Sequence, residues 1–210
     1  MNGHLRVIRF DEVYIATDDS RIAEAGQNLN LNVLITRKEH RTGTDRVAEC
    51  MELVDADIYV NIQGDEPMIE PKAIEMVTAA LAECDDARVM ASNAYVPFSD
   101  PCDVVDTNNV KVVLSKNDRA LFYSRQPIPY PKSSTTHYLR QLGLYAFRKK
   151  GLQVFAEHKP GAVENAEGVE MLRFLEYDHE VLMVKVNDSS IPVDTEADLS
   201  RVIELMLPLA

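Results

Sequence analysis

One predicted helix entrance carries residues that could bind a ligand: the stretch HRTGTDRVAE at 40–49. It combines hydroxyls, a glycine and guanidinium groups, on Thr42, Gly43, Thr44, Arg41 and Arg46. The first turn of a helix presents unpaired N–H groups and partial positive charge, so it can receive an anion or a polar ligand. From these residues alone an ordinary capped helix is the simpler interpretation, with Thr44 or Asp45 as the cap and the arginines in solvent.

A carboxylate, Asp65, follows an apolar run within NIQGDEP (61–67). In an open α/β sheet, ligands bind beyond the carboxyl ends of the strands, and a carboxylate there can hold Mg²⁺ against substrate phosphates. Asp194, in SIPVDTEADL (190–199), lies at a second predicted strand-to-helix transition. Its alternative role is to cap the last helix, which Thr195 could do equally well. The two aspartates together suggest a metal–phosphate site, whereas either one alone is weak evidence.

The elements that position these groups belong to a chain of 210 residues that is 46% hydrophobic, enough to bury a substantial core. The chain contains no run of about 18 apolar residues that could span a membrane. Because the first ten residues lack the apolar stretch of a signal peptide, we expect a cytoplasmic protein. Three scattered cysteines are typical of reduced thiols rather than of disulfides.

Charge and missing motifs exclude several classes of function. The formal net charge of −12 argues against binding to a nucleic-acid backbone, although a local cluster of cations or a metal can still attract a small anion. The glycines form neither a dinucleotide fingerprint nor a Walker phosphate loop, and the sequence has no G-x-S-x-G elbow. The five histidines show no metal-ligand spacing. Hydride transfer, P-loop chemistry and serine hydrolysis are therefore disfavoured.

Short apolar strands alternate with amphipathic helices at both ends of the chain. Strands are predicted at 12–18, 32–36 and 57–63 with helices after each, followed near the C-terminus by a helix at about 165–177, a strand at 181–186 and a helix at about 195–206. This alternation indicates an α/β fold with a mostly parallel, doubly wound sheet covered on both faces.

The middle of the chain differs, because its β-like segments leave no room for helices between most of them. These segments are RVMASNAYV, VKVVLS, ALFYSR and YLRQLGLYAF. They predict a mixed or antiparallel extension of the sheet. We expect one domain over residues 1–210, with a flap or dimerisation segment at about 119–148 that includes the proline-rich loop QPIPYPKSSTTH.

Six motifs carry a resemblance to a known family: HRTGTDRVAE, NIQGDEPMI, VKVVLSKNDRALFYSRQPIPY, YLRQLGLYAF, EGVEMLRFLE and IPVDTEADL. In order and approximate spacing, from about residue 5 to the C-terminus, the sequence resembles the CMP-Kdo synthetases, or 3-deoxy-manno-octulosonate cytidylyltransferases. The resemblance implies a Rossmann-like nucleotidyltransferase fold and a homodimer. It also implies Mg²⁺-dependent transfer of CMP from CTP to a 3-deoxy-2-ulosonic acid, with release of pyrophosphate, for bacterial lipopolysaccharide or capsule.

The resemblance also implies roles for individual residues. Asp65 and Asp194 match the aspartates that hold magnesium against the phosphates and the sugar acid. The residues that match the nucleotide-binding elements are Thr42, Gly43, Thr44, Arg46 and Gln63. Those in the matching sugar-acid pocket are Arg125, Gln141, Tyr145 and Glu170, with Lys111 as a further cation. Considered alone, Arg125 could instead form a surface ion pair, and Tyr145 could be an ordinary core residue.

Two departures from the family pattern bear on function. The family begins with a strand, a basic phosphate-binding loop and a helix, which this sequence does not match, so we expect an unpaired strand edge and a weaker hold on the triphosphate. Gln141 stands where the family commonly has histidine, and Glu170–Met171 where it has Glu-Gln. Because buried polar contacts discriminate strongly between similar substrates, an amino-substituted relative of Kdo is an alternative substrate.

Three hypotheses about function follow. The first is a magnesium-dependent cytidylyltransferase that activates a 3-deoxy-ulosonic acid. The second is a truncated, inactive relative that only binds nucleotide or pairs with another subunit. The third is a nucleotidyltransferase that uses another nucleotide or a sugar phosphate on the same fold, since fold does not determine substrate.

Overall fold

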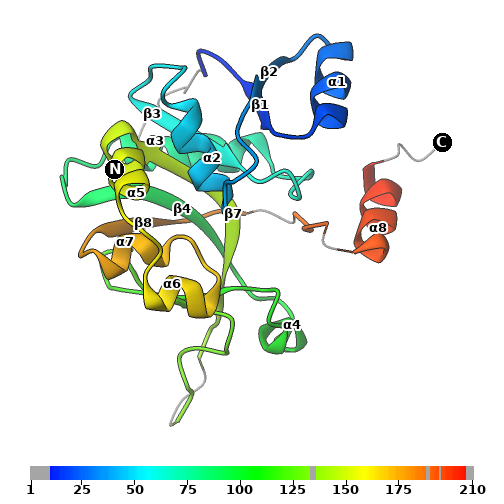
Figure 1. Cartoon of the computed structure of the whole chain (residues 1–210). Coiled ribbons are helices and arrows are strands. Elements are labelled where there is room, and N and C mark those ends of the chain that lie inside the picture. The colour runs from blue at the N-terminus through cyan, green and yellow to red at the C-terminus, as the bar shows by residue number, and fades with distance from the viewer. Residues whose placement is uncertain (1–9, 133–135, 188–189, 194, 207–210) are drawn as a thin grey trace, which may run out of the picture.

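The computed structural model describes residues 10–132, 136–187, 190–193 and 195–206. Its strands are β1 (Tyr14–Thr17), β2 (Asn32–Ile35), β3 (Ile58–Ile62), β4 (Val89–Pro97), β5 (Lys111–Leu114), β6 (Ala120–Ser124), β7 (Leu139–Arg148) and β8 (Glu180–Lys185). Its helices are α1 (Ser20–Asn28), α2 (Gly43–Cys50), α3 (Pro71–Ala82), α4 (Pro101–Val105), α5 (Lys149–Glu157), α6 (Ala162–Glu167), α7 (Leu172–Glu176) and α8 (Glu196–Met206). Figure 1 shows their arrangement, with the long strands β4 and β7 at the centre.

Strand β7 organises the larger sheet. One edge of β7 pairs antiparallel with β4, and the other edge pairs antiparallel with β3 in its C-terminal half and with β5 near its start. Strand β6 pairs antiparallel with β5, and β8 lies parallel to β4. The α/β fold class and the antiparallel extension expected from the middle of the sequence are confirmed.

Strands β1 and β2 form a separate two-stranded parallel sheet, in register from Tyr14↔Asn32 to Thr17↔Ile35. Among the described residues, no ladder of hydrogen bonds joins this small sheet to the larger one. Within the described residues, the outer edge of each of its two strands therefore has no ladder partner.

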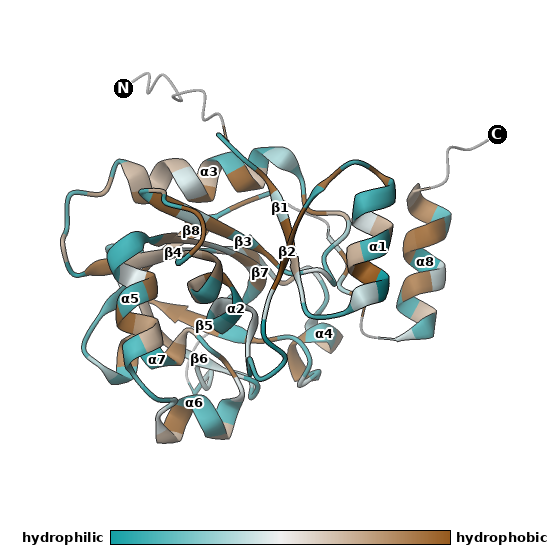
Figure 2. Ribbon diagram, turned by 45° about the horizontal axis from the view of Figure 1, so that its top comes forward, coloured by the Kyte–Doolittle hydropathy of each residue, from teal (hydrophilic) through white to brown (hydrophobic). Residues whose placement is uncertain are grey.

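Alternation along β7 divides the core into two layers, because successive side chains of a strand point to opposite faces. Leu142, Leu144 and Ala146 pack with the buried residues of α3, whereas Tyr145 and Phe147 pack with those of α2, α5 and α7. Figure 2 shows α3 on one side of the sheet and these other helices on the opposite side. Covering both faces explains why all but the last residue of β4 are buried.

The prediction of one helix at about 165–177 is wrong, because the structure has two short helices there, α6 and α7. Gly168 has φ +62, a left-handed conformation that ends α6 and that glycine adopts at little cost. No helix within the described ranges is long and apolar enough to cross a bilayer.

A buried arginine links three helices beneath the sheet. The guanidinium of Arg173 in α7 lies 2.6 Å from Glu164 in α6 and 3.1 Å from Asp45 in α2, and its side chain is 4% exposed. Its guanidinium carbon also lies 3.6 Å from the centre of the Phe155 ring in α5. The charge is thus compensated by carboxylates and by an aromatic face.

We expect Arg173→Met to lower the free energy of unfolding by about 3–5 kcal/mol, because it leaves the buried Glu164 carboxylate without its partner. Urea unfolding followed by circular dichroism measures this change. Arg88→Met is the matched control, since Arg88 forms its ion pairs with Asp86 and Glu180 at the exposed surface. Equal, small effects of the two substitutions would contradict the structural role of Arg173.

Candidate active site

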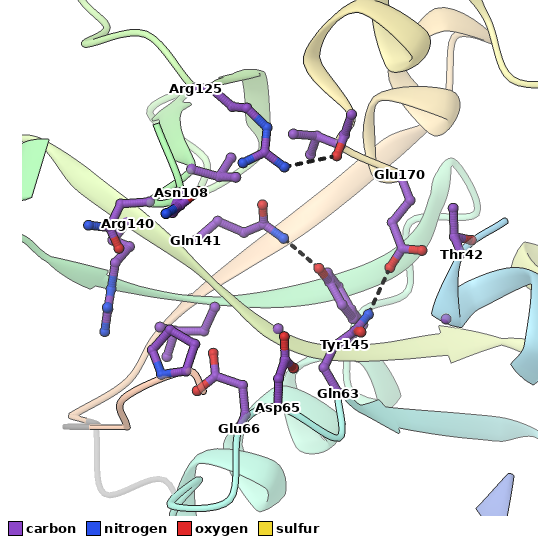
Figure 3. A pocket seen from close by; sticks show the side chains of 18 of the residues that line it. Thr42, Gln63, Asp65, Glu66, Asn108, Arg125, Arg140, Gln141, Tyr145 and Glu170 are labelled. Atoms are coloured by element: carbon purple, nitrogen blue, oxygen red, sulfur yellow. Dashed lines mark hydrogen bonds between the residues drawn. The ribbon is translucent and has the colours of Figure 1, made fainter. Parts of the chain in front are cut away.

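A cleft of about 600 Å³ lies beyond the end of β3, beside β7 and facing the start of α2. Its volume is in the usual range for small-molecule sites, roughly 300–1,000 Å³. Eight of the predicted site residues line it: Thr42, Gly43, Gln63, Asp65, Arg125, Gln141, Tyr145 and Glu170. Figure 3 shows seven of them, all but Gly43, labelled around the cleft, although they come from distant parts of the sequence.

The predicted helix entrance is both a cap and part of the cleft. Thr42 is the N-cap, since its hydroxyl accepts the Asp45 N–H at 3.1 Å and the Asp45 carboxylate accepts the Thr42 N–H in return. The expected cap was Thr44 or Asp45, and the reciprocal capping box explains why Thr42 takes the position instead. Gly43 lies directly against Gln63, because a Cβ there would be 2.9 Å from Nε2 and would displace the end of that side chain.

Glu170 joins this helix entrance to the sheet. Its carboxylate accepts the backbone N–H of Thr44 at 3.2 Å and the side-chain amide of Gln63 at 3.4 Å. Burial raises the pKa of Glu170 above its ordinary value, against the effect of hydrogen bonds from Thr42 and Thr44.

Asp65 and Glu66 are adjacent in sequence and differ in environment. The Asp65 side chain is exposed in the cleft, and no described residue donates a hydrogen bond to its carboxylate. Glu66 is 8% exposed, and its carboxylate accepts the Ser190 hydroxyl at 2.5 Å. The backbone carbonyl of Asp65 accepts the Val193 N–H at 2.8 Å, which attaches the segment at 190–193 to the same loop. Asp65 is therefore the carboxylate that is free to meet a ligand.

Arg125 is held by backbone carbonyls. Its guanidinium donates to the carbonyl oxygens of Thr107 and Glu167 at 2.8 Å each, and to that of Gly168 at 3.4 Å. No described carboxylate forms an ion pair with this guanidinium, so the surface ion pair considered as its alternative is not found there. Three neutral acceptors fix the arginine at the cleft and leave its charge available to an anion.

Tyr145 and Gln141 form a hydrogen-bonded pair along β7. The Gln141 amide donates to the Tyr145 hydroxyl at 2.6 Å, and Figure 3 shows the two side chains meeting inside the cleft. Burial raises the pKa of Tyr145 well above its ordinary value, with a smaller contribution from the charge of Glu170. The hydroxyl therefore stays neutral and can serve as a hydrogen-bond donor. Tyr145 is also packed in the core, as its alternative interpretation expected, and its role in the sugar-acid pocket stays a prediction.

The remaining predicted residues are not on the cleft wall. Arg46 pairs with Asp18 at 2.5 Å and also bonds Thr36, which places it between α2 and the small sheet. Lys111 is buried, and its ammonium donates to two backbone carbonyls. Thr44 meets Glu170 through its backbone and lies just behind Gly43. Asp194 lies outside the described residues.

Sequence reasoning missed several cleft residues, including Glu66, Arg140, Asn108, Asn109, Glu164 and Asn165. Arg140 donates to the Ser190 carbonyl at 3.3 Å and lies beside Asn108 in Figure 3. Glu66 could have been found from its position next to Asp65 in NIQGDEP. The asparagines and Arg140 had no such signal, since they lie in segments that look like ordinary loop and strand.

A family model described as "Cytidylyltransferase" matches residues 4–183. The chain belongs to the cytidylyltransferase family. It is 37% identical over 199 residues to the 3-deoxy-manno-octulosonate cytidylyltransferase of Christiangramia forsetii, a match that covers 94% of this chain and 80% of that protein. It is 36% identical over 203 residues to the enzyme of the same name from Escherichia coli, with 96% and 81% covered. These matches confirm the resemblance drawn from the motifs.

Solved structures of cytidylyltransferases agree with the fold. A CMP:2-keto-3-deoxy-manno-octonic acid synthetase complexed with CTP matches with a TM-score of 0.85 and 36% identity, over 93% of this chain and 80% of that one. The inositol-1-phosphate CTP transferase from T. maritima matches with a TM-score of 0.61 and 15% identity, over 93% of this chain and 74% of that one. At this lower identity the likeness concerns the fold alone.

The raised pKa of Glu170 predicts a pH-dependent effect of Glu170→Gln. Above the ordinary glutamate pKa, the folded state binds more protons than the unfolded state, so ionisation of Glu170 makes folding less favourable as the pH rises. As the pH is raised from acid to neutral, the unfolding free energy of the wild type should therefore fall relative to that of Glu170→Gln. Urea titrations at several pH values measure the difference. The exposed control Glu24→Gln should follow the wild type, and a constant difference for Glu170→Gln would contradict the prediction.

Proposed function

We propose that this chain transfers CMP from CTP to a 3-deoxy-2-ulosonic acid, Kdo or a close relative, and releases pyrophosphate, in the synthesis of bacterial lipopolysaccharide or capsule. The observation that carries the proposal is the single cleft in which the Thr42–Gly43 turn, Asp65 and Arg125 face one volume. Two relatives more than a third identical over most of this chain are named for this reaction, and a structure of such an enzyme holds CTP.

The cleft wall near α2 suits the nucleotide. The turn at Thr42–Gly43 opens the first turn of a helix, where unpaired N–H groups favour polar or anionic groups. Gln63 lies against Gly43 and presents a side-chain amide, a group that can pair with the donors and acceptors on the edge of a base. We assign the nucleotide to this wall.

The opposite wall suits the sugar acid. Arg125 can pair with a carboxylate through two parallel N–H groups, a geometry that lysine lacks. The neutral hydroxyl of Tyr145 and the amide of Gln141 add hydrogen-bonding groups beside it. The anomeric hydroxyl of the sugar then gives up its proton to water and attacks the α-phosphorus of CTP. An oxygen–phosphorus bond forms, and the bond to pyrophosphate breaks. The residues contribute by positioning the two reactants.

Asp65 fits the role of a magnesium ligand. Its carboxylate is exposed in the cleft, and hard cations such as Mg²⁺ take oxygen ligands of this kind. The second predicted ligand, Asp194, lies outside the described residues and is kept in the proposal on the strength of the family resemblance. Bound magnesium would neutralise charge on the phosphates and lower the pKa of the attacking hydroxyl.

The identity of the sugar depends on Gln141 and its neighbours. The side-chain carbonyl oxygen of Gln141 is buried and accepts no hydrogen bond within the described residues. Met171, which follows Glu170 in the sequence, is fully buried. An unpaired buried acceptor favours a substrate that brings a hydrogen-bond donor. This environment supports testing both Kdo and an amino-substituted ulosonic acid. The homodimer and the cytoplasmic location stay predictions.

Pyrophosphate release from this chain, with CTP, Mg²⁺ and a panel of 3-deoxy-ulosonic acids, tests the proposal directly. Release with one sugar acid and CTP, but not with UTP, is the expected result. CTP should also raise the melting temperature more than UTP does, because a ligand that binds the folded state stabilises it. Absence of release with every sugar would favour the nucleotide-binding, inactive alternative if CTP still stabilises the chain.

Asp65→Asn should lower the rate of pyrophosphate release by roughly 10²–10³-fold, because losing a metal ligand removes several kcal/mol of charge stabilisation. Titration with Mn²⁺, followed by electron paramagnetic resonance, should show weaker metal binding by the variant even without substrates. Asp85→Asn is the control, since Asp85 is exposed and does not line the cleft. Unchanged Mn²⁺ binding by Asp65→Asn would remove Asp65 from the metal site.

A further inference from the structure

Strand β7 carries a bulge where it passes the cleft. Asn93 and Tyr95 of β4 lie opposite Tyr145 and Gln141 of β7, so the three residues at 142–144 face the single residue between them. Bulges interrupt the hydrogen-bond ladder, re-aim the backbone and are common beside active sites. Here the residues on both sides of the bulge line the cleft, as does Gly143 at its centre.

The backbone of Gly143 lies against two cleft residues. Its carbonyl accepts the Gln63 N–H at 3.1 Å, and a Cβ added to it would lie 3.5 Å from Cγ of Glu66, the carbon beside its carboxylate. Through Ser190, the same carboxylate also holds the segment at 190–193. A Cβ at Gly143 would lie 2.9 Å from Cγ of Gln63, so the backbone of the bulge is in direct contact with that side chain. The position of the bulge therefore determines where Gln63 and Glu66 lie.

Asn93 completes the bulge from the other side. Its side-chain amide donates to the carbonyl oxygens of Leu142 at 2.9 Å and Leu144 at 3.0 Å. All three side chains are at most 2% exposed, so these carbonyls would be buried without a donor if the amide were absent. One side chain thus takes the place of the missing ladder bonds.

The neighbouring Ser92 is a natural comparison. It is as completely buried as Asn93, and its hydroxyl donates to the carbonyl of Val77 in α3 at 2.8 Å. Its contact ties a helix to the sheet and does not involve the bulge. The two adjacent polar side chains therefore have separable consequences.

We propose that Asn93 is a positioning residue for the cleft: its two hydrogen bonds hold the bulge of β7 in place and thereby set the positions of Gln63 and Glu66. Asn93 itself is not among the residues that line the cleft. For its effect on turnover the inference rests on the proposed function, in which Gln63 belongs to the nucleotide-binding residues.

Hydrogen exchange measured by mass spectrometry tests this in Asn93→Leu and Asn93→Ala. Peptides covering 61–66 and 140–146 should exchange about tenfold faster or more, because a buried hydrogen bond lost without replacement shifts local opening by that order. The dissociation constant for CTP should rise by a similar factor. The alanine variant leaves space for water near the two carbonyls, so it serves if the leucine variant fails to fold.

Ser92→Ala is the matched control, and urea unfolding gives the stability of each variant. Ser92→Ala should speed hydrogen exchange in peptides of α3, while exchange in the peptide 61–66 and the CTP affinity stay unchanged. The proposal is overturned if a folded Asn93 variant keeps wild-type exchange in 61–66 and 140–146. It is equally overturned if exchange there rises no more than in Ser92→Ala at matched stability. A wild-type chain that releases no pyrophosphate would refute the proposed function, whereas the exchange data would still decide the role of Asn93.

Discussion

The close approach of two backbone segments to the side chain of Gln63 is the constraint on which the cleft depends. A Cβ at Gly43 would lie 2.9 Å from its Nε2, and a Cβ at Gly143 would lie 2.9 Å from its Cγ. The start of α2 and the bulge of β7 therefore hold the glutamine from two sides. Gln63 in turn donates to Glu170. These contacts fix the relative positions of three parts of the chain: the start of α2, the bulge of β7 and the segment before α7. A rigid support of this kind lets a cleft bind without reorganising.

Much of this arrangement could be predicted from the sequence, because the signals are local. Short apolar runs marked the strands, and the rule that ligands bind beyond strand ends pointed to Asp65. The hydroxyl-rich entrance before 44–50 marked the start of a helix, although the reciprocal bonds of the capping box moved the cap to Thr42. The motif order then identified the family, and the comparisons confirmed it.

What the sequence did not reveal depends on long-range contacts. The bulge of β7 arises from its register with β4, and nothing in YLRQLGLYAF states that Asn93 lies across from it. Arg46 occupies the expected helix, yet its partner Asp18 lies in the loop directly after β1, and this ion pair turns Arg46 away from the cleft. Likewise, Arg140 has a role only because the segment at 190–193 folds back onto the loop of Asp65. The spacing of residues along the chain does not reveal such long-range contacts.

Charge explains how an acidic chain can offer a site to anionic ligands. Among the described residues, four carboxylates line the cleft: Asp65, Glu66, Glu164 and Glu170. Glu164 is neutralised by the buried Arg173 at 2.6 Å, and burial raises the pKa of both Glu66 and Glu170. Three arginines, Arg41, Arg125 and Arg140, share the same cleft. The local field is therefore far less negative than the net charge of −12 suggests, and Asp65 remains as the carboxylate positioned to attract a cation. Because the other acids are buried or paired, Asp65 is the exposed carboxylate of the described cleft wall, which is why the proposed magnesium site is assigned to it.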